Sequence, residues 1–233
     1  MFDDRPIVED ARGIFDTVRA GGVAIFPVSV GYAIVGHGDE AIRRIYAAKE
    51  RSFEKPCGNF CDWTLFTEAI VTSDRARAVV RAVIMDHDLP FSIVAPYRAD
   101  HPVIASLGPF ARRNASKAGT MDMLLNAGPL HDEIARLARE NAVAVVGSSA
   151  NLSLTGSKFR LEDIEAQVLD AADLAIDYGL CPYHNGQGLG STIIDLDGFE
   201  TIRLGCVYDR ICAILDEEFD IDLKAITAAK GSD

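Results

Sequence analysis

The chain has 233 residues, of which 48% are hydrophobic and 25% charged, so it is long enough to bury a substantial core. Its formal net charge of −12 at pH 7 opposes attraction of the bulk surface to a nucleic-acid backbone. No segment approaches the run of about 18 apolar residues that a membrane-spanning helix needs, and the acidic N-terminus is unlike a secretory signal. We therefore expect a cytoplasmic globular protein that makes no membrane contact.

Helical periodicity accounts for much of the chain. Apolar residues recur every three or four positions in several segments, so each segment presents one apolar face. We expect Gly21-Gly22 to end the first helix, Asp39 to cap the second, and Ser73 or Asp74 to cap the third. The predicted helices cover residues 10–20, 39–46, 73–84, 130–140, 161–171 and 207–217.

Strands are predicted between these helices. Short apolar runs bounded by turn residues mark residues 23–26, 91–95, 121–125, 142–146 and 174–176. Asp197-Gly198 is a strong turn signal and predicts a hairpin that pairs residues 192–196 with 200–204. This alternation predicts a single α/β domain with a mixed sheet over residues 1–222. Residues 223–233 are expected to be a flexible C-terminal tail, because chain termini fray.

The cysteines and histidines do not predict a metal site. Cys57 and Cys61 are close in sequence, but no second cysteine pair or neighbouring histidine completes a zinc set. We expect all five cysteines to be free, partly buried thiols in a reducing compartment. The sequence also lacks a Gly-x-Ser-x-Gly elbow, a Walker loop and a Gly-x-Gly-x-x-Gly fingerprint.

Two cations lie at the end of the second predicted helix. Lys49 and Arg51 are two positions apart, so they converge on one ligand only if the helix ends there. The residue before Pro56 avoids the helical region, which favours an ending in this segment. The pair can then hold a phosphate with a planar guanidinium and a mobile ammonium group. The alternative is a solvated helix end whose charges complement the helix dipole.

The segment VAVVGSSANLSLTG, residues 143–156, runs from a predicted buried strand into small polar residues. Gly147 allows a ligand to approach the main chain, and the hydroxyl and amide groups of Ser149 and Asn151 can help to hold an oxyanion. In α/β sheets, ligands bind beyond the carboxyl ends of the strands. The alternative is a polar turn whose Ser or Asn caps the next helix.

Two further segments contain candidate binding residues. Gly188 and Gly190 precede Ser191, and Arg203 ends the predicted hairpin; the alternative is a hairpin with incidental glycines. Near the N-terminus, Ser29 and Tyr32 lie in a predicted loop after a strand, where they can present a hydroxyl and an aromatic ring to a ligand. Tyr32 can equally be a core residue with a hydrated hydroxyl.

The order and spacing of these segments resemble the YrdC/YciO family, whose best-known members are threonylcarbamoyl-AMP synthases. The resemblance extends over about residues 8–210. The matching segments are PVSVGYAI (27–34), IYAAKER (45–51) with Lys55-Pro56, PFSIV (90–94), SANLS (149–153), STIID (191–195) and RLG (203–205).

The resemblance implies a twisted mixed sheet with surrounding helices and a deep, positively lined cleft. Longer members have an extra C-terminal domain, which we do not expect in this chain. It also implies a reaction in which threonine and bicarbonate form a carbamate that attacks the α-phosphate of ATP. Pyrophosphate leaves, and the threonylcarbamoyl group is passed to a tRNA adenosine. ATP is then a substrate accompanied by Mg²⁺, which is held by phosphate oxygens and water.

The resemblance also implies roles for individual residues, although it assigns no catalytic residue and no protein metal site. The nucleotide-binding residues implied are Lys49, Arg51, Ser92, Ser149, Asn151, Ser191 and Arg203. The substrate-binding residues implied are Ser29, Tyr32 and Lys55.

The chain departs from the family pattern at residues that would contact the substrate. Val28 and Val30 replace two threonines of the first loop, and Ser29 replaces the acid between them. In MDMLLN, residues 121–126, Leu124 stands where the family has an arginine. Two alternatives follow. One is a diverged paralogue that acts on a different carbamate or acyl group, and the other is a non-catalytic module that binds nucleotide, double-stranded RNA or tRNA.

Overall fold

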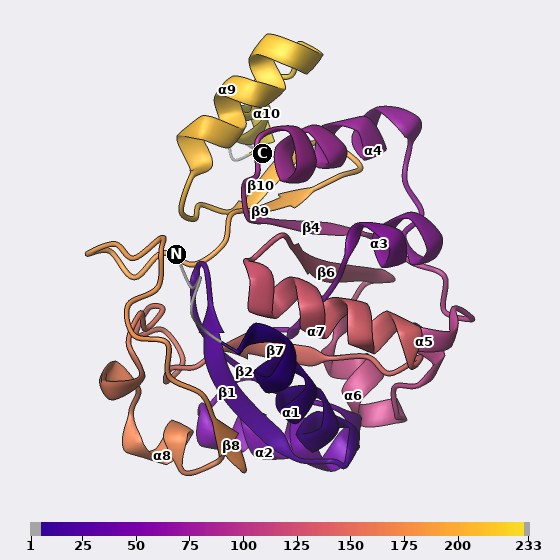
Figure 1. Cartoon of the computed structure of the whole chain (residues 1–233). Helices are drawn as coiled ribbons and strands as arrows, with labels where there is room; N and C mark the ends of the chain where they lie inside the picture. The colour runs from indigo at the N-terminus through magenta and orange to yellow at the C-terminus, as the bar shows by residue number, and fades with distance from the viewer. Residues whose placement is uncertain (1–5, 231–233) are drawn as a thin grey trace.

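A computed structural model describes residues 6–230, in which ten strands form one mixed sheet (Figure 1). The strand order is β10-β9-β4-β6-β3-β7-β2-β1-β8, and β5 pairs with β6. The β1–β8, β3–β6 and β4–β9 pairs are parallel and the others are antiparallel, which confirms the predicted α/β fold with a mixed sheet. The strands are β1 Val23–Val28, β2 Gly31–Gly36, β3 Gly58–Phe60, β4 Phe91–Pro96, β5 Ser116–Lys117, β6 Thr120–Leu125, β7 Val146–Ser149, β8 Leu174–Ala175, β9 Ile193–Asp195 and β10 Glu200–Arg203.

Helices cover both faces of the sheet (Figure 1). On β1, Val23 and Ile25 pack into one hydrophobic cluster with α2, whereas Ala24 and Phe26 pack into a second with α1 and α7. A strand buried on both faces is apolar at every position, as β1 is. The helices are α1 Ile7–Arg19, α2 Gly38–Ala48, α3 Trp63–Ala69, α4 Asp74–Arg81, α5 Pro102–Ala105, α6 Pro109–Asn114, α7 Pro129–Glu140, α8 Ala166–Leu169, α9 Tyr208–Phe219 and α10 Leu223–Lys230, with a π-helical turn at Ala82–Asp86 and a 3₁₀ turn at Leu161–Asp163.

None of the helices between residues 6 and 230 has both the length and the apolar character needed to cross a membrane. The five cysteines are buried and free, as predicted.

The predicted loop around Ser29 and Tyr32 is instead a β-hairpin. β1 continues through Pro27 to Val28, and β2 returns from Gly31 with Pro27 opposite Tyr32 in the register. The two-residue turn has the sequence Ser-Val, which lacks the Asn-Gly or Asp-Gly signal that would have marked it. As a result Tyr32 lies on a central strand, with its side chain 1% exposed.

Two other local predictions are wrong. Asp39 does not cap α2; its Oδ1 accepts a 2.9 Å hydrogen bond from the Ala111 amide and so caps the first turn of α6. The predicted helix over residues 161–171 is broken into the 3₁₀ turn and α8, because Ile164 and Glu165 adopt extended conformations. Glu165 then accepts a hydrogen bond from the Leu152 amide, a tertiary contact that helical periodicity does not encode.

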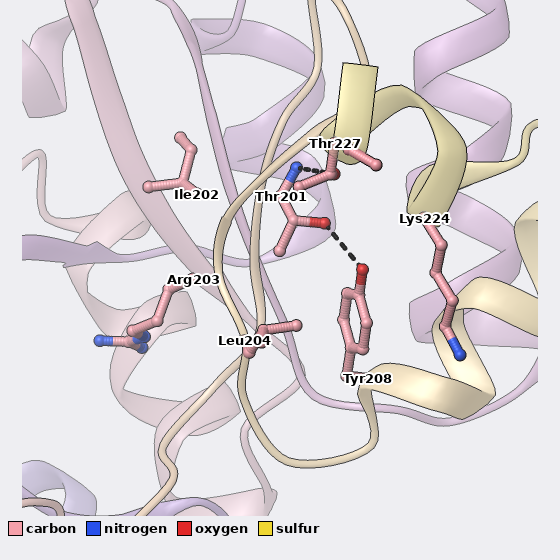
Figure 2. A pocket seen from close by; sticks show the side chains of 8 residues that line it. Thr201, Ile202, Arg203, Leu204, Tyr208, Lys224 and Thr227 are labelled. Carbon is pink, nitrogen blue, oxygen red and sulfur yellow. Dashed lines mark hydrogen bonds between the residues drawn. The ribbon is translucent and has the colours of Figure 1, made fainter. Parts of the chain in front are cut away.

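The C-terminal segment also differs from the predicted flexible tail. Residues 223–230 form α10, and Leu223 is only 1% exposed. The Oγ1 of Thr227 accepts a 3.1 Å hydrogen bond from the Thr201 amide, which joins α10 to β10 at the edge of the sheet (Figures 1 and 2). Packing of this kind orders short helices that would not form alone. Residues 231–233, the rest of the predicted tail, lie outside the described residues.

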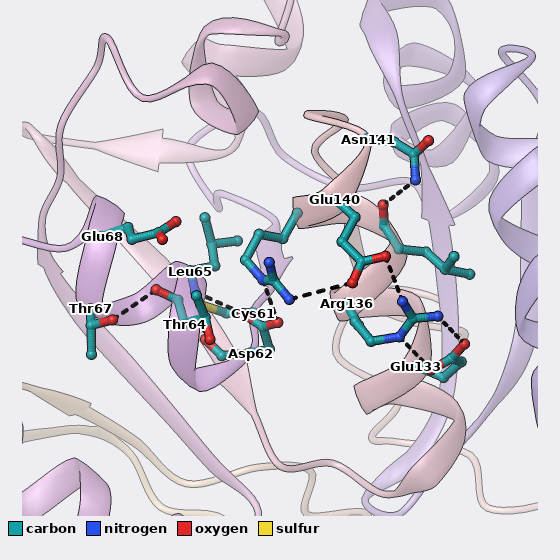
Figure 3. Close-up of polar contacts among 12 residues, drawn as sticks. Cys61, Asp62, Thr64, Leu65, Thr67, Glu68, Glu133, Arg136, Glu140 and Asn141 are labelled. Atoms are coloured by element: carbon teal, nitrogen blue, oxygen red, sulfur yellow. Dashed lines mark hydrogen bonds and ion pairs between the residues drawn. The ribbon is translucent and has the colours of Figure 1, made fainter.

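Asp62 joins α3 to α7 (Figure 3). Its Oδ1 accepts a 2.7 Å hydrogen bond from the Leu65 amide and caps α3, and its Oδ2 accepts a 2.8 Å hydrogen bond from Nε of Arg139 on α7. Both side chains of this ion pair are largely buried, at 18% and 25% exposure, so solvent screens the pair less than an exposed one. One carboxylate thus fixes two helices that lie next to β3.

Asp62→Ala removes the cap and the partner of Arg139, and we expect it to lower the free energy of unfolding by about 2 kcal/mol. Urea denaturation measures the change. Thr67→Ala is the control, because its hydroxyl makes only an exposed local hydrogen bond to the Thr64 carbonyl. Equal stability of the two variants would contradict the assigned role of Asp62.

Candidate functional site

A cleft of about 720 Å³ gathers most of the predicted site residues. Its lining comes from the end of α2, from β2, β3, β4, β6 and β7, from the loop before β9, and from β10. The predicted residues that line it are Lys49, Arg51, Lys55, Ser92, Ser149, Asn151, Ser191, Arg203 and Tyr32. Segments drawn from between Val28 and Leu204 therefore form one concave surface, which agrees with the expected cleft.

Lys49 lies at the centre of this arrangement, directly after α2. It is 1% exposed, and its Nζ donates hydrogen bonds to the main-chain carbonyls of Ser149 and Asn151. The Lys49 carbonyl in turn accepts a 3.0 Å hydrogen bond from the Ser153 amide. Burial lowers the pKa of Lys49 to about 7, and the nearby charge of Arg51 acts in the same direction. The side chain is therefore not a solvated helix end.

The ending of α2 explains how Lys49 and Arg51 reach the same cleft. Glu50 adopts a left-handed conformation with φ 48°, and the Arg51 amide donates a 3.0 Å hydrogen bond to the Tyr46 carbonyl, as in common helix C-terminal motifs. The guanidinium of Arg51 then donates to the carbonyls of Lys55 (3.1 Å) and Pro56 (2.7 Å). Those two bonds hold the guanidinium at the cleft and leave other N–H donors for a ligand.

The side of the cleft formed by β4, β9 and β10 carries the third cation. The hydroxyls of Ser92 and Ser191 share a 2.8 Å hydrogen bond. Arg203 donates to the Ser191 carbonyl from Nε at 3.1 Å and from Nη2 at 2.8 Å, and to its hydroxyl at 2.9 Å. Figure 2 shows the guanidinium of Arg203 pointing away from Tyr208 and Lys224, which line a neighbouring hollow of about 620 Å³ that Arg203 also borders.

The Ser-Ala-Asn segment lies where β7 ends against β2. Gly147 is required there, because a Cβ atom at this position would come within 2.5 Å of the Ile34 carbonyl oxygen. The Ala150 amide donates to the Tyr32 carbonyl at 2.7 Å, which fixes the turn after the strand. The Oδ1 of Asn151 is buried and has no hydrogen-bond partner among the described residues, so it remains available to a ligand.

Two of the predicted substrate-binding residues are placed differently from the expectation. Ser29 is 6% exposed and is not among the described residues that line the cleft; its amide and carbonyl bond to Ala127 and Tyr183. Tyr32 lines the cleft, but its hydroxyl donates a 2.6 Å hydrogen bond to Asp177, and burial raises its pKa. Tyr32 is thus the core residue of the alternative interpretation. Lys55 is exposed at the rim.

Asp122 is a lining residue that sequence reasoning did not identify. It lies on β6 two positions before Leu124, so both side chains face the cleft while Met121 and Met123 face the core. Burial raises the pKa of Asp122 to about 6, although Arg203 and Arg51 oppose the shift. The alternation in MDMLLN was the available signal, because it places an acid on the face that carries Leu124.

The lining is cationic overall. Glu54 and Asp122 are its only acidic side chains among the described residues, against Lys49, Arg51, Lys55, Lys117 and Arg203. In a chain of net charge −12 this is a local reversal of sign, which focuses anions on the cleft.

The raised pKa of Asp122 makes a stability prediction. The folded state retains the proton between pH 3.8, the ordinary pKa, and about 6, so this group's contribution to stability falls as the pH rises through that window. Asp122→Asn carries no charge, and we expect it to be more stable than wild type by up to about 3 kcal/mol at pH 8 and equally stable at pH 3. Urea denaturation at both pH values measures this. A variant that is less stable than wild type at pH 8 would mean that attraction to the two arginines outweighs burial in setting the pKa of Asp122.

Comparison with known proteins gives the same fold. A family model named for Sua5, YciO and YrdC, described as "telomere recombination", matches residues 16–205. A hypothetical protein, smu.1377c from Streptococcus mutans, has a TM-score of 0.73 at 21% identity, over 90% of this chain and 92% of that one. E. coli YciO has a TM-score of 0.66 at 19% identity over 88% and 94% of the two chains.

A variant of P. abyssi Sua5 has a TM-score of 0.71 at 17% identity, and the match covers 93% of this chain but 61% of Sua5. The TM-scores show a shared fold. The family model covers most of the chain, from α1 to the end of β10. The chain therefore belongs to the Sua5/YciO/YrdC family.

Proposed function

We propose that the protein is a nucleotidyltransferase of the threonylcarbamoyl-AMP synthase type, which binds ATP in the cleft and transfers its adenylyl group to a carbamate. The observation that carries this proposal is the set of three cations, Lys49, Arg51 and Arg203, each held by main-chain carbonyls with N–H donors to spare. Donors fixed before the ligand arrives stabilise developing charge without reorganisation. A triphosphate is the ligand that such a set fits best.

Related structures support this choice of ligands. P. abyssi Sua5, which matches at a TM-score of 0.64 and 19% identity, has been crystallised with L-threonine. Full-length HypF, which matches at a TM-score of 0.63 and 15% identity, has been crystallised in a phosphate- and nucleotide-bound form. Because P. abyssi Sua5 was crystallised with L-threonine, threonine is the first amine to test.

The proposed reaction has two steps. The ammonium group of the amine and bicarbonate combine to give a carbamate, one water and one proton. A carbamate oxygen then attacks the α-phosphorus of ATP, and the bond to the β-phosphate breaks to release pyrophosphate. Charge moves toward the leaving group, which is where Lys49 and Arg51 would act, while Asn151 and Ser191 would orient the substrates. The product would supply the carbamoyl group for a tRNA adenosine.

Mg²⁺ would accompany ATP and neutralise part of the phosphate charge. Its ligands would be phosphate oxygens and water, because the described lining offers only Glu54 and Asp122 as carboxylates and does not form a cage around an ion. The cations of the cleft would act beside it, on oxygens that Mg²⁺ leaves free.

An amine other than threonine is a second candidate substrate, and the apolar part of the cleft supports it. Val28, Val30 and Phe60 line the cleft as part of one hydrophobic cluster, and Leu124 packs against that cluster. An apolar surface of this kind provides no partner for the α-carboxylate of an amino acid, and an unpaired buried anion costs several kcal/mol. A diverged enzyme that uses a different amine in the same adenylation chemistry is therefore the second proposal.

Pyrophosphate release tests the proposed function. Purified protein with ATP, Mg²⁺, bicarbonate and L-threonine should release pyrophosphate, and omission of the amine or of bicarbonate should abolish the signal. Arg51→Ala should lower the rate at subsaturating ATP by at least about tenfold, because it removes charge-assisted hydrogen bonds worth about 1.5–3 kcal/mol. Arg43→Ala is the matched control, since Arg43 lies on α2 just before this segment but stacks on Phe110 and is not among the described residues that line the cleft.

Absence of bicarbonate-dependent pyrophosphate release with threonine and with a panel of other primary amines would contradict the proposal. Release that depends on another amine but not on threonine would select the second candidate substrate.

A further inference from the structure

Asp122 is an acidic side chain in a cleft that otherwise attracts anions. It lies on β6 opposite Val94 of β4, on the same strand face as Leu124. Across the parallel pairing with β3, Gly58 has no side chain, and a Cβ atom there would lie 3.5 Å from Oδ2 of Asp122. The carboxylate is therefore bordered by bare main chain rather than by a covering side chain.

The described residues do not satisfy this carboxylate. Its side chain accepts no hydrogen bond from residues 6–230 and forms no ion pair with them, and its Oδ1 is buried without a partner. The nearest cations, Arg51 and Arg203, donate instead to the main-chain carbonyls of Pro56 and Ser191. Burial of a hydrogen-bond acceptor without a donor costs free energy. A ligand that supplies a donor recovers that free energy when it binds.

The charge of Asp122 excludes a phosphate as that ligand. With its pKa raised to about 6 by burial, the group is mostly ionised at pH 7.5, when it repels the anion that Arg51 and Arg203 attract. These two arginines are the cations that act on it, Arg51 from the segment after α2 and Arg203 from β10. The partner that fits an ionised, unpaired carboxylate is a positively charged group with several N–H donors.

We propose that Asp122 is the specificity-determining residue of the cleft and binds the primary ammonium group of the amine from which the carbamate forms. The inference rests on the proposed carbamate chemistry and names its substrate class. That class is primary amines with an apolar body that fits beside Leu124, Val28 and Phe60. The ammonium group, rather than a carboxylate, is the part of the substrate that the protein recognises by charge.

Two ligands that differ in one group test this recognition. L-Threonine and L-threoninol share the ammonium, the hydroxyl and the methyl group, but threoninol has a hydroxymethyl group in place of the carboxylate. Calorimetric titration of each, with and without a non-hydrolysable ATP analogue, should show that wild type binds threoninol at least as tightly as threonine. Asp122→Asn should weaken threoninol binding at least tenfold.

The same variant should bind the ATP analogue as tightly as wild type or several-fold more tightly, because a negative charge leaves an anion site. Opposite effects on the two ligands separate recognition from structural damage, which would weaken both. Glu54→Gln is the matched control, since Glu54 is the other acid of the described lining but is exposed at the rim. It should change neither affinity by more than about twofold.

Three outcomes would overturn the inference: unchanged threoninol affinity in Asp122→Asn, threonine bound tenfold more tightly than threoninol by wild type, or no binding of either amine. The proposed function is judged separately by pyrophosphate release. Amine binding that depends on Asp122 without any pyrophosphate release would remove the proposed function and keep the ammonium site. Pyrophosphate release that is insensitive to Asp122→Asn at low amine concentration would remove the ammonium site and keep the proposed function.

Discussion

The hydrogen bonds from the ammonium of Lys49 to the carbonyls of Ser149 and Asn151 hold the site together. They join the end of α2 to the end of β7, two points about 100 positions apart in the sequence. An ammonium group this deeply buried is tolerated only when it is hydrogen-bonded, and here the partners are carbonyls that carry no net charge. No anionic partner among the described residues therefore cancels the charge of Lys49, and a phosphate bound in the cleft would favour the protonated form, whose pKa burial lowers to about 7.

The other two cationic side chains are also anchored by uncharged groups. Arg51 is anchored by the carbonyls of Lys55 and Pro56, and Arg203 by the carbonyl and hydroxyl of Ser191. Had carboxylates anchored these side chains, each cation would have been neutralised before a ligand arrived. Main-chain anchoring fixes the geometry and retains the charge, so an acidic protein can keep a local site for anions.

Much of this arrangement could be predicted from the sequence. The order of the Lys-x-Arg, Ser-Ala-Asn and Ser-Thr-Ile segments indicated the fold and the cleft, and all three segments line that cleft. Features that depend on tertiary contacts or on atypical turn residues could not be predicted from the sequence. The hairpin before Tyr32 lacks a standard turn pair, Ser29 is not among the described residues that line the cleft, and α10 is held by a hydrogen bond to β10 rather than by its own helix propensity. Asp122 could not be predicted from the family pattern, whose departure in this strand is Leu124, although both residues lie on the same strand face.

The most direct test of the account is a crystal structure of the protein with a non-hydrolysable ATP analogue. We expect phosphate oxygens within about 3.5 Å of Nζ of Lys49 and of the guanidinium groups of Arg51 and Arg203, with the carbonyl anchors of all three side chains unchanged. A nucleotide bound elsewhere, or phosphates in the cleft that contact none of these three cations, would contradict it.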